Sequence, residues 1–358
     1  MEYIFKDVLD VKNGKNQREV ECPDGQYPIY GSGGVMGYAS DYICEADTVI
    51  IGRKGSINNP IYAEEPFWNV DTAFGLCAKK DILLPKYLFY FCIKFDFERL
   101  NRTVTIPSLT KSDLLKIKIQ VPSLDVQQEV IDKLTKIESI LNFRKQELKL
   151  LDELVRGRFV ELFGDPVSNS YGLSEATLPE LGVFGRGVSK HRPRNDPKLL
   201  GGDYPLIQTG DIANAGLYIT SYNSTYSEFG LKQSKMWEKG TLCITIAANI
   251  AKTAILEFDA CFPDSVVGFT ANERTNNIFI HYWFSFFQAI LESQAPESAQ
   301  KNINLKILSE LKVIVPEKER QNEFANFVHR IDKSKLIVQK ELDETQLLFD
   351  SLMQEYFG

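Results

Sequence analysis

The sequence predicts an α+β protein in which two mixed α/β domains are separated by two long antiparallel coiled-coil helices, with an internal pseudo-twofold repeat. Two observations predict this class. Residues 122–164 align without a gap on residues 316–358, so the chain contains a copy of itself. Both segments carry a helical apolar stripe, whereas the residues before each of them carry short β-rich runs bounded by Gly, Pro or charged turns. At 358 residues, the chain is long enough for two such pairs of segments.

The duplication extends beyond the two aligned segments. Gln127 aligns with Gln321, and Phe163 aligns with Phe357. Asp71 aligns with Asp264 and Gly75 with Gly268 at an offset of 193, and Tyr27-Pro28 aligns with Tyr204-Pro205 at an offset of 177. Because the offset at the last pair is shorter, the second half must contain additional residues between Tyr204 and Asp264. The sequence therefore divides into four segments, which are residues 1–121, 122–164, 165–315 and 316–358.

The first and third segments predict the same succession of short elements. Strands are expected at 48–52, 73–77 and 117–121, with counterparts at 241–246, 266–270 and 311–315. A helix is expected at 85–95, with its counterpart at 278–291. A shorter helix is expected after Thr110, whose hydroxyl caps it while Asp113 completes a capping box. Asn304 is a good N-cap at the matching place in the second half.

The second and fourth segments predict long helices that pair with each other. Apolar residues recur at alternating steps of three and four, which is the a/d spacing of a coiled coil. They are Val130, Leu134, Ile137, Leu141, Leu148, Leu151, Val155 and Leu162 in the first helix, and Phe324, Val328, Ile331, Val338, Leu342, Phe349, Leu352 and Tyr356 in the second. At 1.5 Å per residue, about 40 residues give a helix of about 60 Å. We expect an antiparallel pair; the alternative is that each helix packs only on its own domain. Polar residues that would help to set the register are Arg144, Arg158, Lys335 and Thr345.

Composition excludes several classes of site. The six cysteines include no CxxC pair and the three histidines share no helix face, so we expect free, buried thiols and no metal. The N-terminus has no signal-peptide pattern. The most apolar run, residues 278–291, is shorter than the about 20 residues that a bilayer requires. The sequence therefore predicts a soluble, cytoplasmic protein without a membrane contact.

No catalytic or nucleotide motif is recognisable. Residues 31–37 resemble a dinucleotide-binding loop, but the third glycine falls one position late, and a glycine-rich turn is the better interpretation. Residues 52–56 do not fit a phosphate-binding loop. Residues 59–62 (Asn-Pro-Ile-Tyr) lack the second proline of the methyltransferase loop that they resemble. We expect a binding protein with no enzymatic activity and no cofactor of its own.

Local basic clusters fit a nucleic-acid partner, although the formal net charge of the chain is −7. One cluster surrounds Asp196, a second directly follows residue 52, and two pairs of residues precede the matched short helices. Phosphate or base contacts are expected from Lys190, Arg192, Arg194, Arg53, Lys54, Arg102, Lys301 and Asn302. The alternative for any one of them is an ordinary solvated loop.

Several strings of residues are typical of one family. They are LVRGRFVELFGD at 154–165, the Val-Pro pairs at 121–122 and 315–316 with Gln127 and Gln321 behind them, Gly-Arg-Gly at 185–187, GDYPLIQTGD at 202–211, and the shorter YPIYG at 27–31. Because these strings occur in this order and together with the duplication, the chain resembles the specificity subunits of type I restriction-modification systems over nearly its whole length.

The resemblance implies a function that the composition does not show. Residues 1–121 and 165–315 are then target recognition domains, each reading one half of a split sequence in double-stranded DNA. The helices set the spacer and dock two modification subunits. Those subunits hold S-adenosylmethionine and methylate adenine, and restriction subunits that cut DNA are further expected partners. From their placement on the helices, we expect the a/d residues and two flanking residues to serve docking and helix pairing. They are Leu134, Leu141, Leu148, Val155, Arg156, Phe159, Val328, Leu342 and Phe349.

Three other interpretations remain open from the sequence. A related restriction or phage-defence system could use the same kind of specificity arm. A coiled-coil scaffold with two non-DNA ligand domains is a second alternative. A methyltransferase in its own right is a third, and the missing glycine loop speaks against it.

Overall fold

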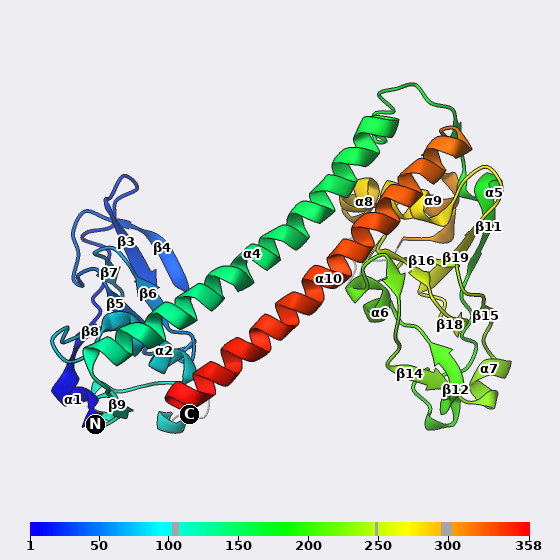
Figure 1. Cartoon of the computed structure of the whole chain (residues 1–358). Helices are drawn as coiled ribbons and strands as arrows, with labels where there is room; N and C mark the ends of the chain where they lie inside the picture. The colour runs from blue at the N-terminus through cyan, green and yellow to red at the C-terminus, as the bar shows by residue number, and fades with distance from the viewer. Residues whose placement is uncertain (102–106, 248–249, 295–302) are drawn as a thin grey trace. The chain divides into compact units, whose positions relative to one another are not determined.

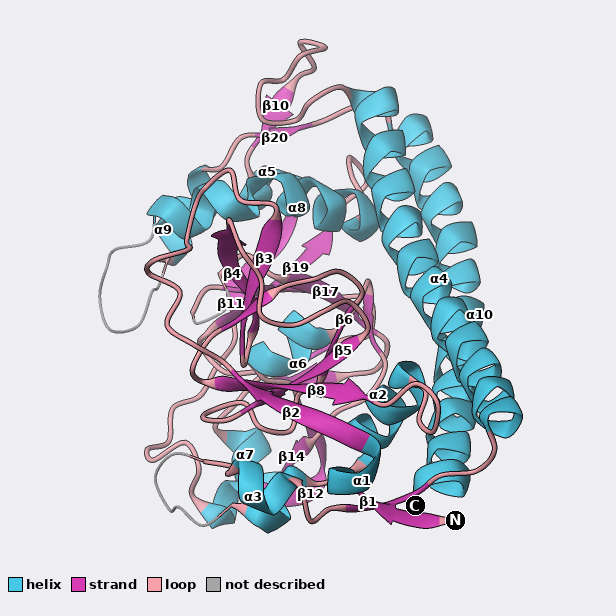
Figure 2. Ribbon diagram, turned by 90° about the vertical axis from the view of Figure 1, so that its left-hand side faces the viewer, coloured by secondary structure: helices cyan, strands magenta, loops and turns pink. Residues whose placement is uncertain are grey.

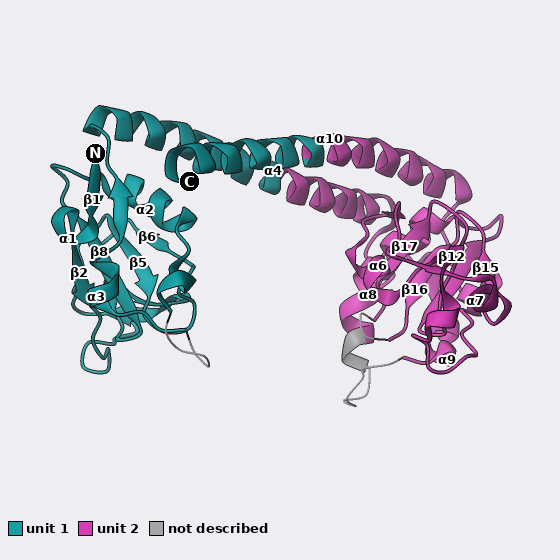
Figure 3. Ribbon diagram, turned by 90° about the horizontal axis from the view of Figure 1, so that it is seen from below, with its two compact units in different colours: residues 1–146, 339–358 teal, residues 147–338 magenta. Residues whose placement is uncertain are grey.

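The computed structural model describes residues 1–101, 107–247, 250–294 and 303–358 (Figure 1). The chain forms two compact units, coloured separately in Figure 3. Unit 1 contains residues 1–146 and 339–358, and unit 2 contains residues 147–338. Each unit therefore combines one globular part with portions of both long helices. The four-segment division of the sequence stays a prediction, because the compact units divide inside the helices.

Unit 1 is a mixed α/β assembly around two small sheets. Its strands are β1 (Glu2–Ile4), β2 (Leu9–Asn13), β3 (Tyr27–Gly31), β4 (Gly34–Ala39), β5 (Thr48–Gly52), β6 (Ile61–Ala63), β7 (Trp68–Asn69), β8 (Ala73–Ala78) and β9 (Lys118–Gln120). Its helices are α1 (Phe5–Val8), α2 (Pro85–Lys94), the 3-10 turn η1 (Phe97–Leu100), α3 (Lys111–Leu114) and the first part of α4 (Leu124–Phe163). The sheet orders are β2-β8-β5-β6 and β4-β3-β7, and β1 pairs with β9. Strand β5 lies between β8 and β6 in its sheet (Figure 2). It is buried along its whole length and apolar at Val49, Ile50 and Ile51, as expected for the middle of a covered sheet.

Unit 2 repeats this plan with longer connections. Its strands are β10 (Glu175–Ala176), β11 (Gly182–Arg186), β12 (Leu200–Leu206), β13 (Tyr218–Ile219), β14 (Ser224–Tyr226), β15 (Met236–Trp237), β16 (Leu242–Thr245), β17 (Thr253–Leu256), β18 (Ala260–Cys261), β19 (Val266–Ala271) and β20 (Val313–Ile314). Its helices are α5 (Leu178–Leu181), the 3-10 turn η2 (Pro197–Leu199), α6 (Thr209–Asn214), α7 (Glu228–Lys232), α8 (Asn277–Gln294), α9 (Leu305–Glu310) and the first part of α10 (Lys318–Phe357). The sheet orders are β11-β19-β16-β17-β13 and β14-β12-β18-β15, and β10 pairs with β20.

Strand registers show that the duplication is structural. Val49 of β5 pairs with Leu76 of β8, and the aligned residues Leu242 and Phe269 pair in the same way between β16 and β19. The weaker alignment of the YPIYG string is confirmed by a parallel pair. Ile29 lies opposite Trp68, as Leu206 lies opposite Cys261 in the second copy. The predicted fold class, with two α/β parts, long helices and an internal repeat, is confirmed.

The long helices run antiparallel, as predicted. In unit 2, Arg158 of α4 pairs with Glu323 of α10 at 2.6 Å, and Asp152 pairs with Lys335, so partner numbers fall along one helix as they rise along the other. In unit 1, Arg144 pairs with Glu341 at 2.7 Å. Three of the four predicted register-setting residues thus make ion pairs across the helices. The fourth, Thr345, instead donates to the Glu341 carbonyl one turn earlier in its own helix.

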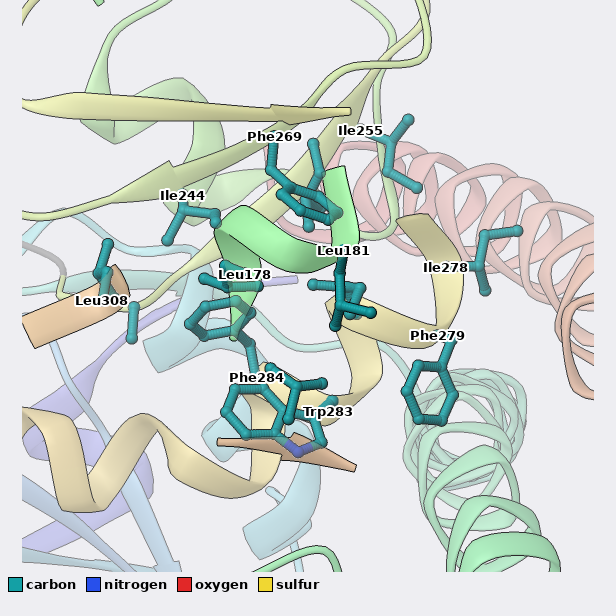
Figure 4. Packing of buried hydrophobic residues seen from close by; sticks show 14 of the residues in the cluster. Leu178, Leu181, Ile244, Ile255, Phe269, Ile278, Phe279, Trp283, Phe284 and Leu308 are labelled. Atoms are coloured by element: carbon teal, nitrogen blue, oxygen red, sulfur yellow. The ribbon is translucent and has the colours of Figure 1, made fainter. Parts of the chain in front are cut away.

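The end of each long helix packs into a hydrophobic core. In unit 2, Phe159 and Phe163 of α4 lie 5.3 and 5.1 Å from Phe279 of α8, measured between ring centroids. Figure 4 shows Phe279 in the same cluster as Trp283 and Phe284. In unit 1, the aligned end of α10 does the same, because Phe357 lies 4.9 Å from the Tyr87 ring of α2. The alternative that each helix packs only on its own domain is therefore wrong.

Local predictions hold at the caps and shift at the ends of elements. Thr110 accepts the Asp113 N–H at 3.2 Å and Asn304 accepts the Ile307 N–H at 2.9 Å, which confirms both caps. The strand expected at 311–315 is shorter, at Val313–Ile314, and the helix expected at 278–291 is longer, at Asn277–Gln294. The strands of the second sheet in each unit were not predicted. Gly and Pro interrupt the apolar pattern of β3, β4 and β12, and β7, β14, β15 and β18 are too short to show a pattern.

The cysteines differ in part from the expectation. All six are free thiols, but Cys22 and Cys77 are partly exposed, whereas Cys44, Cys92, Cys243 and Cys261 are buried. Within the described residues there is no group of His, Cys, Asp and Glu side chains that could hold a metal ion. In the same part of the chain, no helix combines the length and the apolar character needed to cross a membrane.

Candidate functional site

The basic loop of unit 2 is held in place at its start. Lys190, Arg192 and Arg194 all lie exposed between β11 and η2. The backbone N–H groups of Lys190 and His191 both donate to the side-chain oxygen of Gln233, at 2.7 and 3.0 Å. A bifurcated contact of this kind fixes the backbone before the arginines. The sequence therefore builds a loop that is polar and yet ordered.

A single carboxylate orients both arginines. Arg192 lies 3.4 Å from Asp264, and Arg194 pairs with the other oxygen of the same carboxylate. Arg192 also donates to the carbonyl oxygens of Ser189 and His191, at 2.6 and 2.8 Å. Exposed ion pairs contribute little to stability, so the consequence is orientation of the guanidinium groups.

The end of the loop is closed by a second carboxylate. Asp196 accepts the Lys198 N–H at 3.0 Å and lies 2.9 Å from His191 Nε2. These contacts, the Lys198 N–H first, hold the pKa of Asp196 below its usual value. The carboxylate therefore stays charged at neutral pH and keeps the turn closed. Asp196 was the acid found beside this cluster from the sequence.

Asp264, the stronger partner of the arginines, was missed because it is remote in sequence. It follows β18, far from the loop along the chain. A signal existed in the duplication, where Asp264 aligns with Asp71. In unit 1, Arg53 donates to the Asp71 carbonyl oxygen at 3.4 Å. Both copies thus place an arginine beside the aligned aspartate.

The basic pair of unit 1 directly follows the buried strand β5. Arg53 and Lys54 are exposed, and both backbone N–H groups donate to the Thr72 carbonyl, at 2.7 and 3.2 Å. The Arg53 guanidinium lies 5.8 Å from the centre of the Phe74 ring. Ser108 forms an isolated β-bridge with Lys54. The structure therefore presents these two cations from a rigid strand end, and their contact with DNA stays a prediction.

Three predicted DNA-contacting residues lie outside the described residues. They are Arg102, Lys301 and Asn302. The five that are described fall into two groups, one in each unit, with Lys190, Arg192 and Arg194 in unit 2 and Arg53 and Lys54 in unit 1.

The helix residues predicted for docking mostly face the chain itself. The buried ones are Leu134, Leu141, Val155, Phe159 and Val328, and the partly buried ones are Leu148, Leu342 and Phe349. Arg156 is exposed, and its guanidinium lies 4.1 Å from the centre of the Phe286 ring. A surface for another protein has to be built from other side chains of these helices.

Apolar side chains off the helix seam are exposed in both units. Phe143 is 68% exposed in unit 1, and Leu347 and Leu348 are exposed in the same unit. Unit 2 exposes Leu150, Leu154, Leu336 and Ile337 on its portions of the helices. The a/d spacing does not identify these residues, because each lies outside the a/d positions. An apolar residue at such a position of a helix is itself the signal that could have identified them. Exposed apolar side chains on helices whose other face is already packed are candidates for a protein interface.

Comparison with known proteins finds similarity over both halves. The profile of a family described as "Type I restriction modification DNA specificity domain" matches residues 1–152 and 180–346. The chain is 20% identical over 288 residues to a protein of Methanocaldococcus jannaschii described as the MjaX specificity subunit of a type I restriction enzyme. That match covers 76% of this chain and 67% of the relative. A type I specificity subunit of Mycoplasma pneumoniae is 24% identical over 148 residues, which are 39% of this chain and 48% of the relative.

Solved structures share the fold. A type I restriction-modification S subunit from M. genitalium superimposes with a TM-score of 0.65 at 18% identity, covering 100% of this chain and 96% of that one. A chain from a structure concerned with complex assembly and conformational transition of the type I R-M system gives a TM-score of 0.60 at 14% identity. It covers 100% of this chain and 97% of that one. The whole chain thus has a known architecture.

Proposed function

The chain belongs to the family of type I restriction-modification DNA specificity domains, and from this premise we propose that it reads a split DNA sequence through its two globular parts. Residues 1–121 read one half-site and residues 165–315 read the other. The chain itself is not catalytic. It directs modification subunits, which hold S-adenosylmethionine, to an adenine in each half-site.

One observation carries the proposal. The two globular parts share strand registers, but they present different basic loops beside the same aligned aspartate. A duplicated scaffold with different surface loops suits two different half-sites on one continuous ligand. Ordered cations at each loop suit the phosphate backbone, which both half-sites share.

The helices are proposed to set the spacer and to bind two modification subunits. Because α4 and α10 pair antiparallel with ion pairs in both units, their register is defined. The exposed apolar side chains of these helices, Phe143 and Leu154 among them, supply the docking surface. Restriction subunits are further proposed partners of the assembled complex. A role on chromosomal DNA would place that complex in the cytoplasm.

Binding by the assembled complex tests the proposal. The chain is purified with its modification subunits, and its affinity for DNA with both half-sites is measured over a salt series. Replacing Lys190, Arg192 and Arg194 together by alanine should weaken binding and flatten the salt dependence, by about 0.9 in slope for each phosphate that the variant no longer neutralises. Lys149→Ala, on the exposed surface of α4, is the matched control with no expected effect on the slope. Unchanged slopes, or no modification subunit bound to the chain, would refute the proposal.

A further inference from the structure

Unit 2 has an open cleft of about 280 Å³ beside the basic loop. Its walls come from the loop itself, from the end of β12 and from β14. The lining side chains divide into a polar set and an apolar set. The polar set is Ser189, Arg194, Asn195, Gln208, Thr209, Ser224 and Ser265, and the apolar set is Leu200, Leu206, Tyr226 and Pro263.

The polar set contains groups that are available to a ligand. Ser189 is only 7% exposed, and its buried hydroxyl has no hydrogen-bond partner among the described residues. Gln208 is exposed at the start of α6, where it forms a capping box with Asp211, and its amide nitrogen makes a long contact to the Ser224 hydroxyl at 3.5 Å. A buried polar group without a partner costs free energy, so Ser189 points to a ligand that completes it.

The first copy does not have the same cleft. In unit 1, Ser32 and Gly33 alone join β3 to β4, whereas residues 207–223, including α6, join β12 to β14 (Figure 1). By strand register, Gly31 is the counterpart of Gln208. The sulfur of Met36 lies 2.6 Å from where a Cβ on Gly31 would stand, so the equivalent place is occupied. The cleft is therefore a feature by which the two copies differ.

We propose that this cleft reads one A·T base pair of the second half-site from the major groove. The inference rests on the proposed function and adds the base that is read. The Gln208 amide oxygen has a second lone pair beside its capping contact, so the amide can accept from adenine N6 and donate to adenine N7. Asn195, which also lines the cleft, donates to thymine O4, and the apolar set receives the thymine methyl group. Arg194, oriented by Asp264, contacts the flanking phosphate.

Substitution at Gln208 tests the proposal in the assembled complex. Binding is measured against a library in which each position of the second half-site carries all four base pairs. Gln208→Ala should lower the preference for A·T at one position by about 5- to 150-fold, with the other positions and the first half-site unchanged. Gln208→Glu should move the preference toward cytosine, because a carboxylate accepts from cytosine N4. Gln128→Ala, an exposed glutamine at the start of α4, is the matched control.

Modified DNA identifies the contacts independently of any variant. Uracil in place of that thymine removes the methyl group, and 7-deazaadenine removes the N7 acceptor. Each modification should weaken binding of the wild-type complex when it is placed at that position. At A·T pairs that the cleft does not read, it should have no effect.

The possible outcomes separate the two proposals. If the wild-type complex shows no second half-site, the proposed function fails and the cleft with it. If the wild-type complex reads a second half-site but Gln208→Ala weakens all sequences equally, the residue contacts the backbone and only the base-reading proposal is overturned. If Gln208→Glu changes no preference at any position, the base-reading proposal is overturned as well.

Discussion

At the residue scale, two buried glutamines join each globular part to its long helix. Gln127 accepts the Leu84 N–H at 2.8 Å and donates to the Ile82 and Pro122 carbonyls, both at 2.9 Å. The aligned Gln321 makes the same set of contacts, with the Thr275 hydroxyl at 2.9 Å and with the Arg274 and Pro316 carbonyls at 3.0 and 2.8 Å. Each amide thus ties the start of a helix to a loop of the adjacent sheet domain.

Removing one of these amides should destabilise its unit. Gln321→Leu leaves buried backbone carbonyls without donors, at a cost of about 1–3 kcal/mol for an unsatisfied buried group. We expect a lower urea midpoint for the unfolding of unit 2, measured through the hydrogen exchange of its backbone amides. Gln128→Leu, an exposed neighbour of the equivalent residue, should leave the midpoint unchanged. Equal midpoints for wild type and Gln321→Leu would contradict this account of the junction.

Asp264 is expected to control how freely the arginines bind DNA. Asp264→Asn removes the charge that holds Arg192 and Arg194, so binding to unrelated DNA should tighten by about 2- to 5-fold and discrimination should fall. The aligned Asp71→Asn is a matched control, because Arg53 contacts the Asp71 carbonyl oxygen, which this substitution retains. Competition binding with and without the half-sites measures both effects. Equal responses to the two substitutions would show that the carboxylate does not act through the arginines.

His281 should make the stability of unit 2 depend on pH. Burial, and then the charge of Lys335, lowers the pKa of His281 from 6.5 to about 4, and its Nδ1 lies 2.9 Å from the Thr253 hydroxyl. Between pH 6.5 and 4, the unfolded chain binds a proton that the folded chain does not. Stability is therefore constant above pH 6.5 with respect to this group and falls below it, by on the order of 1–3 kcal/mol.

A variant without this imidazole isolates the effect. His281→Asn should reduce the loss of stability between pH 7 and pH 5, measured as the shift in the urea midpoint. A wild type and a variant that lose stability in parallel over this range would assign the pH dependence to other groups.

At the scale of elements, sequence predicted best where local chemistry decides the outcome. The a/d stripe was sufficient for α4 and α10, and capping chemistry was sufficient for the starts of α3 and α9. Strand β5 was predicted at its observed bounds because an apolar, β-branched run, Val49 to Ile51, lies between Thr48 and Gly52. Strand β12 was not, because glycines and a proline interrupt it and only tertiary pairing with β14 and β18 defines it.

The candidate site shows the same limit. Composition around residues 190–194 was sufficient to locate a basic loop, but not its partner Asp264, which tertiary structure brings to it. The helix seam was identified, but whether a seam residue is free for another protein depends on packing. Leu134 and Val155 lie on the seam and are buried in the chain's own cores, whereas Phe143 lies off the seam and is exposed.

This difference gives a prediction about docking. Phe143→Ser should leave the unfolding midpoint unchanged, because the side chain is exposed, and should weaken the binding of a modification subunit. Leu134→Ala should instead lower the unfolding midpoint, because the side chain is buried and the cavity that it leaves costs about 2–5 kcal/mol of stability. Co-purification with the modification subunits, combined with urea unfolding, separates the two effects. Undiminished binding by Phe143→Ser would remove this surface from the docking interface.

At the scale of the whole molecule, the duplication explains both the common scaffold and its differences. Aligned residues occupy equivalent places at the helix ends, where Phe163 packs in unit 2 as Phe357 packs in unit 1. The copies differ where β12 leads to α6 and where β3 leads directly to β4. This combination of a common frame and divergent loops fits the proposed reading of two different half-sites.

The most direct test of the central claim is a map of methylated adenines in the host genome, made with the gene intact and deleted. If the chain directs methylation to a split sequence, the map should show a split motif with a fixed spacer when the gene is intact and no such motif when it is deleted. The Gln208→Ala substitution should then relax one position of a single half-site. A map without such a motif, or one that deletion of the gene leaves unchanged, would contradict the claim that this chain directs methylation to a split sequence.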